Sequence, residues 1–487
     1  MREITQAEAD VASIAWTVHV ANRKAALNPG ADGDGASAPG VAPLSYGPAE
    51  ARNKDVTGDA RHKLAITPPP VTIDAAVDAD GGGAALTGAI AFPGEIRAQV
   101  RLATICTEPG TGRLLFFGGD GVSNGVLHGA FSQAAPLDAF VNNNGWHDDT
   151  ADGRVTACIT FSGRRSVTLD RPEQAARVLS VLPRYVPGIG YFTSLNDVAT
   201  DAVAVGATVG ATGRQASFMA DIYPILRSVS HLHWVNRFGA KGHGVGKADY
   251  LSPGATQQLA DPDASPGSEA PARRTAIFAR VRDPADLTRA AQLMPTLPPE
   301  VIKAPKNSED LIYDVGAVTA LQYAMLTKWR DGDFDNDHAP GDPFVPLDSI
   351  EIAQQPAALD LAAPQSSAGT PLFADIEAWQ IMRDRQIYAA PLRLCAQMQP
   401  GDMTMGNALP WQADYFGCDE TWWPVQRPTD VIHDGVVASW APSGWSIGED
   451  NNGCHEMVRN WWKLGLIVSP DGGATYHEQE RDDGSPA

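Results

Sequence analysis

The pattern of hydrophobic and polar positions differs between the two halves of the chain. Over residues 64–205, short apolar or β-branched runs alternate with turns rich in glycine and asparagine. The clearest runs are residues 89–92, 113–117 and 154–161, and the clearest turns are residues 118–121 and 143–145. Short strands separated by such turns predict an antiparallel sheet or sandwich in the first half of the chain.

The second half has a more helical pattern. Residues 221–226 lead into a stretch of helical character, and residues 317–329 repeat apolar side chains at helical spacing. Helices are also predicted over residues 5–26 and 373–394.

The chain is therefore predicted to have an α+β fold. We expect a β-rich domain with an N-terminal helix over residues 1–215, and a mainly helical and loop domain over residues 216–470. A polar tail follows over residues 471–487, and the chain after residue 469 is expected to be partly disordered.

Composition narrows the range of partners. Acidic residues outnumber basic residues by 58 to 37, which gives a formal charge of -21. Such a surface repels phosphate backbones and anionic lipid, so neither a nucleic acid nor a membrane is an expected partner. The sequence contains no apolar run long enough to span a bilayer and no signal-peptide pattern at its start. We therefore expect a cytoplasmic protein, with export by another route left open.

The five cysteines are sparse and follow no ligand spacing. They lie at positions 106, 158, 395, 418 and 454, without a Cys-x-x-Cys pair. This arrangement argues against a disulfide framework and against a structural zinc site. Most of them are expected to be small buried hydrophobic residues, with Cys418 as the exception.

Three short motifs resemble known sites but lack essential parts. Residues 241–248 resemble a phosphate-binding loop without its first glycine, and residues 331–337 alternate carboxylates without the glycine and glutamate of a calcium loop. His231 and His233 have the spacing of a strand-borne metal pair, but the sequence offers no third ligand nearby. We therefore predict no metal site.

Tryptophans are concentrated near the C-terminus. Seven of the twelve lie between positions 411 and 462. Because indole rings often simply fill a core, this concentration alone indicates no function. Asp414 precedes Cys418 by four residues, which is one turn if the segment is helical.

The segment around Cys418 resembles that of a known enzyme family. It reads Trp-x-Ala-Asp-x-x-x-Cys and continues with Trp-Trp-Pro-x-Gln-Arg-Pro. This is similar to the quinoprotein family of lysine ε-oxidases and glycine oxidases that carry cysteine tryptophylquinone, a cofactor made from the protein's own side chains. Further blocks of similarity follow in order at residues 16–26, 112–123, 142–153, 221–226, 322–332, 376–378 and 457–465. The chain is accordingly identified as a shortened member of that family.

The resemblance implies which residues form the cofactor. The cysteine partner corresponds to Cys418, and the tryptophan partner to Trp461 in the Met-Val-x-x-Trp-x-x-Leu-Gly block. The adjacent Trp462 remains an alternative partner. Trp422 and Trp423, together with Trp411, are expected to wall the pocket rather than to react.

Further site residues are predicted around this pair. Asp414 is the candidate base, because enclosure near tryptophans raises a carboxyl pKa, and its alternative role is to orient the Cys418 loop. Arg427 is a candidate for binding a substrate carboxylate, or else a structural ion pair. His147, beside two aspartates in a block that resembles an active-site loop, is a second candidate for catalysis.

The resemblance also implies an activity. The family oxidises a primary amine or amino acid, passes two electrons to oxygen, and releases ammonia and hydrogen peroxide, with the quinone acting as the electron sink. It implies a separate flavoprotein for maturation and a homo-oligomer. One alternative is a dehydrogenase, or a tailoring enzyme acting on a natural product or peptide with the same cofactor. A second alternative is a binding or scaffold protein without the cofactor.

Overall fold

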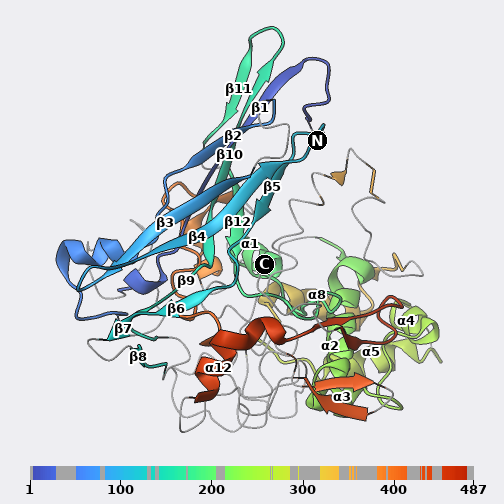
Figure 1. Ribbon diagram of the computed structural model, residues 1–487. Helices are drawn as coiled ribbons and strands as arrows, with labels where there is room; N and C mark the ends of the chain where they lie inside the picture. The colour runs from blue at the N-terminus through green and yellow to red at the C-terminus, as the bar shows by residue number, and fades with distance from the viewer. Residues whose placement is uncertain are drawn as a thin grey trace.

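A computed structural model (Figure 1) provides the structure of the chain. It describes residues 4–28, 51–76, 83–128, 133–137, 142–171, 174–204, 214–263, 265, 267–285, 294, 318–338, 350–351, 354–355, 358, 381–390, 393–413, 428, 430–433, 436–440 and 452–479. Strands dominate the first half of the chain and helices the second, as predicted, so the fold class is α+β.

Two antiparallel sheets form the first half. The larger sheet has the order β11-β10-β1-β2, and a further strand, β12, pairs with β10. Its strands are β1 (Val11–Ala21), β2 (Val71–Asp74), β10 (Ala151–Phe161), β11 (Ser166–Leu169) and β12 (Ala176–Ser180). The second sheet contains β3 (Ala84–Phe92), β4 (Ile96–Thr107) and β5 (Leu114–Phe117). Three predicted apolar runs lie in β3, β5 and β10, which confirms that part of the prediction.

The two sheets share one hydrophobic core. Val18 and Val20 of β1 and Leu86 and Ile90 of β3 are buried in the same cluster of side chains. Their even spacing, two residues in β1 and four in β3, places each pair on one face of its strand. Burial of these faces stabilises the sheets by roughly 1.5–3 kcal/mol for each fully buried large aliphatic side chain.

The predicted helix over residues 5–26 is wrong. Residues Val11–Ala21 form β1, the strand that pairs with both β2 and β10. Ile14, Trp16, Val18 and Val20 recur at every second position, which is the period of a strand, and β-branched side chains favour it. The apolar positions of this segment therefore repeat with the two-residue period of a strand, and not with the 3.6-residue period of a helix.

Helices and short strand pairs make up most of the second half. The helices are α1 (Leu195–Ala204), α2 (Tyr223–His231), α3 (Arg237–His243), α4 (Pro253–Leu259), α5 (Ala270–Phe278), α8 (Ala320–Asp331) and α12 (Asn452–Asn460). Its short strands are β13 (Ala216–Ser217), β14 (Phe334–Asp335), β15 (Tyr388–Ala390), β16 (Arg393–Leu394), β17 (Asp430–His433), β18 (Val436–Ser439), β19 (Leu466–Val468) and β20 (His477–Gln479). Four further short strands lie in the first half, where β6 (Ser123–Gly125) pairs with β9 (Trp146–Asp148) and β7 (Leu127–His128) pairs with β8 (Gln133–Ala134).

The residues at the two ends of α8 explain why this helix begins and ends where it does. Thr319 and Gln322 form a reciprocal capping box at the N-terminus, and Gly332 ends the helix at a φ of 83°. Both devices satisfy backbone groups that a helix end leaves without partners. The helix predicted over residues 317–329 is thus confirmed, with bounds shifted by two or three residues.

Two other predictions from the sequence need correction. In the predicted helix over residues 373–394, the described part contains a 3-10 turn (Arg385–Ile387) and the strands β15 and β16. The tail expected to be partly disordered is ordered as far as residue 479, because β20 pairs with β19 and Tyr476 is fully buried. No helix among the described residues is long and apolar enough to cross a membrane.

A buried ion pair joins the end of β1 to the end of β9. Lys24 Nζ lies 2.6 Å from Asp148 Oδ2, and the two side chains are 1% and 0% exposed. Lys24 also donates to Thr150 Oγ1 at 3.1 Å, and Asn22 Nδ2 donates to Asp148 Oδ1 at 2.7 Å. The backbone N–H of Trp411 donates to Asp148 Oδ2 at 3.0 Å. One carboxylate therefore holds three distant segments together.

Arg52 fixes the chain just before Trp411. Its fully buried guanidinium donates to the backbone carbonyl oxygens of Lys24, Met405 and Asn407, at 3.1, 3.0 and 2.7 Å respectively. Since Lys24 also pairs with Asp148, the two cations brace the same junction.

We expect Lys24→Met to destabilise the protein by about 3–5 kcal/mol, because it leaves the Asp148 carboxylate buried without its cation. Urea unfolding followed by tryptophan fluorescence measures the loss. The exposed Lys63→Met is the matched control and should change stability by less than about 0.5 kcal/mol. Equal stability of the two variants would contradict the role given to this ion pair.

Candidate functional site

The predicted site residues divide into two groups. Trp461, Trp462, His147 and Trp411 lie in described parts of the chain. Asp414, Cys418, Trp422, Trp423 and Arg427 lie outside the described residues, so their roles remain predictions.

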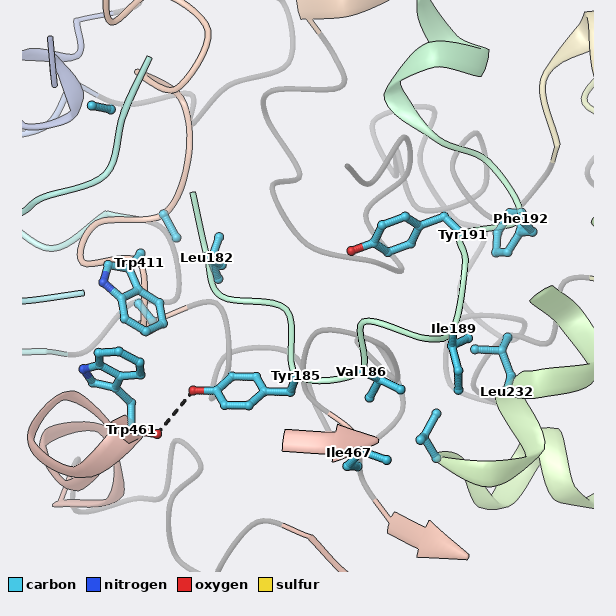
Figure 2. Close-up of a cluster of buried hydrophobic side chains, with 14 of the residues drawn as sticks. Leu182, Tyr185, Val186, Ile189, Tyr191, Phe192, Leu232, Trp411, Trp461 and Ile467 are labelled. Atoms are coloured by element: carbon cyan, nitrogen blue, oxygen red, sulfur yellow. Dashed lines mark hydrogen bonds between the residues drawn. The ribbon is translucent and has the colours of Figure 1, made fainter. Parts of the chain in front are cut away.

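Trp461 is held at the point where a helix tightens. α12 ends at Asn460, and residues Trp461–Lys463 continue as a 3-10 turn. The Trp461 side chain is 8% exposed. The hydroxyl of the buried Tyr185 donates to the Trp461 carbonyl oxygen at 3.2 Å, which fixes the backbone of the turn (Figure 2).

Trp411 packs against Trp461. Their ring centroids are 5.1 Å apart, with an interplanar angle of 76°, the edge-to-face arrangement that aromatic pairs favour. Figure 2 shows the two indoles side by side, next to Leu182. Trp411 is 1% exposed, and its Nε1 donates to the Gly121 carbonyl oxygen at 3.2 Å.

Gly121 packs closely against the Trp461 ring. It has a φ of +81°, and a Cβ at this position would lie 2.2 Å from Cζ2 and 2.6 Å from Cη2 of Trp461. Neither distance is sterically possible, and a positive φ itself favours glycine. The backbone at residue 121 therefore approaches the outer edge of the indole more closely than any other residue type allows.

Gln412 ties the Gly121 backbone to the segment that leads to Asp414. Its fully buried side chain donates to the Gly121 carbonyl oxygen at 3.1 Å and accepts a hydrogen bond from Ser123 Oγ at 2.6 Å. A glutamine can serve both partners because its amide is a donor and an acceptor. Residues 411 and 412 are thus locked to the loop that contacts Trp461.

Asp149 supports the same loop from another side. Its Oδ2 accepts the Val122 N–H at 3.0 Å, and a Cβ on Gly119 would lie 2.5 Å from its Cγ. Burial raises the pKa of Asp149 to about 7, with Asp148 and Asp120 adding repulsion and the Val122 hydrogen bond opposing the rise. A carboxyl group whose pKa is raised to about 7 therefore lies behind the loop that contacts Trp461.

Trp462 faces other surroundings. It is half-buried, its Nε1 donates to the Arg459 carbonyl oxygen at 3.0 Å, and Lys463 Nζ lies 5.2 Å from its ring. Because neighbouring positions of a helical turn point in different directions, only one of the two indoles packs on Trp411. That indole is Trp461.

His147 lines a different pocket. It lies on β9 between Trp146 and Asp148, and alternation along a strand turns its side chain away from theirs. The imidazole is 6.4 Å from the Phe92 ring and borders a cavity of about 300 Å³ with Ile90, Ile96 and Asn124. Burial lowers the His147 pKa, with Asp148 opposing the shift. The structure thus places His147 at this cavity, and its catalytic role stays a prediction.

The motifs set aside as metal sites have structural roles. His231 and His233 lie at the end of α2 and in a 3-10 turn, so the strand-borne geometry considered for them is wrong. Asp337 accepts hydrogen bonds from Ser217 Oγ and the Met219 N–H. Within the described ranges, no group of three or more His, Cys, Asp or Glu side chains could hold a metal ion.

Four residues of this site were not identified from the sequence as part of it. Gly121, Gln412, Asp148 and Asp149 all lie within the blocks of similarity quoted above, but their roles depend on contacts across long sequence separations. The Gly-Gly-Asp-Gly cluster was interpreted only as a turn. Its glycine content was the one signal for a close backbone approach.

The structure defines an α+β protein in which Trp411 and Trp461 form an enclosed aromatic pair beside the Gly121 turn. Residues 1–171 match the family described as "L-Lysine epsilon oxidase N-terminal", and residues 301–440 match "L-lysine epsilon oxidase C-terminal domain". Together these matches cover more than half of the chain. The chain belongs to the L-lysine epsilon oxidase family.

Individual relatives agree with this assignment. The L-lysine 6-oxidase of Marinomonas mediterranea is 24% identical, over 78% of this chain and 65% of the relative, so the chain spans just under two thirds of that protein's length. Two solved structures of L-Lys epsilon-oxidase from the same organism cover 98% of this chain. One, a Schiff base intermediate with L-Lys, has 19% identity, a TM-score of 0.65 and 85% of its chain covered. The other has 18% identity, a TM-score of 0.67 and 84% covered.

Gly121→Ala should disturb the packing around Trp461 more than the same substitution at Gly110 does. The methyl group would overlap the Trp461 ring, so we expect a loss of roughly 1–3 kcal/mol from overpacking, added to roughly 1–2 kcal/mol for the positive φ. Gly110→Ala is the control, because Gly110 has a φ of +83° and open space around it. Near-ultraviolet circular dichroism should change in the first variant alone, and identical spectra would refute this packing.

Asp149 should make stability depend on pH. Because its pKa is raised from 3.8 to about 7, the folded protein binds a proton more tightly than the unfolded chain does. Its contribution to stability is therefore largest below about pH 4 and is lost as the pH rises to 7, by at most about 4 kcal/mol. Urea unfolding between pH 5 and 8 should show Asp149→Asn gaining stability relative to wild type as the pH rises. A constant difference would contradict the raised pKa.

Proposed function

We propose that this protein is an amine oxidase that uses a cysteine tryptophylquinone made from Cys418 and Trp461. The observation that carries the proposal is the enclosure of the Trp461 indole between Trp411 and the side-chain-free wall at Gly121. Membership of the L-lysine epsilon oxidase family supports the reaction class.

The surroundings of Trp461 fit such a group. The indole has a fixed position, because its backbone is tied to Tyr185 and its ring is packed on Trp411. Its Cζ2 and Cη2 atoms lie close to the Gly121 backbone. Cys418 follows the rigid Gln412 by six residues, which is short enough for it to reach the same pocket. Trp462, which packs at the surface side of the turn, is the less suitable partner.

When formed, the quinone would supply an electrophile for the amine and an acceptor for two electrons. The residues of the chain would do the rest. Trp411, with Trp422 and Trp423 as further candidates, would exclude water from the reacting edge of Trp461. Asp414 would take the proton from the carbon beside the amine, as a general base. Arg427 would bind a substrate carboxylate.

Asp149 would adjust the pocket electrostatically. It lies behind the Gly119–Val122 turn rather than beside Trp461, and it would hold a negative charge there above pH 7. A negative charge near the pocket favours a cationic amine over a neutral one.

A primary amine or amino acid is the expected substrate class. The relative solved as a Schiff base intermediate binds L-Lys. A net charge of -21 raises the local concentration of cationic amines near this protein. We further propose that oxygen is the electron acceptor, that ammonia and hydrogen peroxide are released, that a flavoprotein matures the cofactor, and that the protein is a cytoplasmic homo-oligomer.

Mass spectrometry of the protein isolated from its natural host tests the cofactor directly. We expect the Cys418 peptide joined to the Trp461 peptide, with two oxygens gained and four hydrogens lost. Trp461→Phe should abolish the cross-link and the visible absorption, whereas Trp462→Phe, the matched control, should retain both. A cross-link to Trp462, or unmodified peptides after co-expression with the flavoprotein, would refute the assignment.

Peroxide release tests the electron acceptor. With a panel of primary amines, an oxidase releases hydrogen peroxide in step with ammonia. Ammonia without peroxide, in the presence of an artificial electron acceptor, would instead indicate a dehydrogenase.

A further inference from the structure

A second cavity lies on the side of the larger sheet that faces away from the hydrophobic core. It has a volume of about 370 Å³ and is lined by residues from β1, from the 3-10 turn Gly58–Leu64 and from residues 399–400. His19 and Ala21 of β1 reach it, whereas Val18 and Val20 between them enter the core. A cavity of this size holds a small ligand.

The ionisable side chains around this cavity are all basic. They are His19, Arg23, Arg61 and His62, and no acidic residue is among the described residues that line it. The chain as a whole carries a formal charge of -21. A group of basic side chains gathered around one concave site is therefore contrary to the overall charge, and its permanent cations are the guanidinium groups of Arg23 and Arg61.

The neighbouring strands extend this basic surface. In the sheet register, His19 of β1 lies opposite Arg154 of β10, and Arg154 lies opposite Arg177 of β12. Residues directly opposite each other share one face of the sheet, and like charges in that position destabilise it. Burial, and after it the positive charge of Arg154, lowers the His19 pKa and so favours the neutral imidazole, which can still donate a hydrogen bond. An anion bound at this face would relieve that repulsion.

The carboxylates near this cavity already have ion-pair or hydrogen-bond partners. Asp402 pairs with Arg23 and accepts the Gln399 N–H. Asp152 accepts the backbone N–H groups of Gly401 and Thr404, and burial raises its pKa to about 6. Arg154 forms no ion pair with any carboxylate in the described part of the chain. Asp152 and Asp402 thus offset only part of the positive charge of the four nearby arginines, which are Arg23, Arg61, Arg154 and Arg177.

The wall formed by Arg61 is rigid. Its fully buried guanidinium donates to the backbone carbonyl oxygens of Asn53, Val56, Ala26, Leu27 and Arg52, at distances of 2.7–3.2 Å. Carbonyl oxygens satisfy its hydrogen bonds without cancelling its charge. A fixed cation costs little reorganisation when an anion binds.

We propose that this cavity binds a small oxyanion, a phosphate or a carboxylate group, against the basic wall of His19, His62, Arg23 and Arg61, with Arg154 adding to the positive field. The binding does not depend on the proposed oxidase activity and is measured without turnover. Residues 399–400 lie in the cavity wall and precede the segment held by Arg52, so a bound anion would also brace the approach to Trp411.

Isothermal titration calorimetry with two probes tests the proposal. Inorganic phosphate and succinate are titrated separately at constant ionic strength, with sodium chloride as the reference salt. We expect saturable binding of at least one probe, and the tighter one identifies the phosphate or the carboxylate as the preferred group. Absence of saturable binding by both probes would overturn the proposal.

Two variants locate the binding. Arg154→Gln should weaken it at least tenfold, and the exposed His62→Ala, which removes a lining side chain, should weaken it at least threefold. Arg165→Gln removes the same charge from the exposed turn after β10 and should leave the affinity unchanged. Thermal unfolding without the probe confirms that each variant is folded. Equal affinities for Arg154→Gln and Arg165→Gln would show general charge attraction and overturn the site.

Discussion

The buried pair of Lys24 and Asp148 is the interaction on which the rest of the structure depends. Removing two charges from water is costly, and it is tolerated here because the remaining hydrogen-bonding positions are filled by Asn22, Thr150 and the Trp411 N–H. The end of β1, the start of β10 and the segment that carries Trp411 meet at this carboxylate. The sheet provides the rigid support, and the tryptophan pair takes its position from the sheet.

The missing side chain at Gly121 shapes the surroundings of Trp461 as much as the packed side chains do. Trp411 and Gln412 both donate to the Gly121 carbonyl oxygen, which presses that backbone against the Trp461 ring. A pre-organised wall of this kind keeps a reactive group in one orientation without an added cost of ordering when a ligand arrives. Asp149, held behind the same turn, makes the electrostatics of the wall sensitive to pH near neutrality.

The sequence predicted the fold class and the strands whose apolar runs are bounded by clear turns, such as β10. It failed for β1, because residues with good helix propensity outweighed a two-residue alternation that pairing with β2 and β10 enforces. It predicted Trp461 in the site by family resemblance, and this assignment stays a prediction; the structure shows that Trp461 packs on Trp411. Gln412 and Asp148 were not predicted because no local pattern encodes a contact between residues 289 or 263 positions apart.

The hydrogen bond from Tyr185 to Trp461 spans 276 residues, and the bond from Trp411 to Gly121 spans 290. Closing such long loops is slow, because their entropy is lost before the contacts repay it. The packing around Trp461 is thus a late product of folding, completed only when the turn Trp461–Lys463 docks on segments that lie far earlier in the chain. Any chemistry that modifies Trp461 must follow the docking of that turn, so an enzyme that matures this site would meet a protein that is already folded.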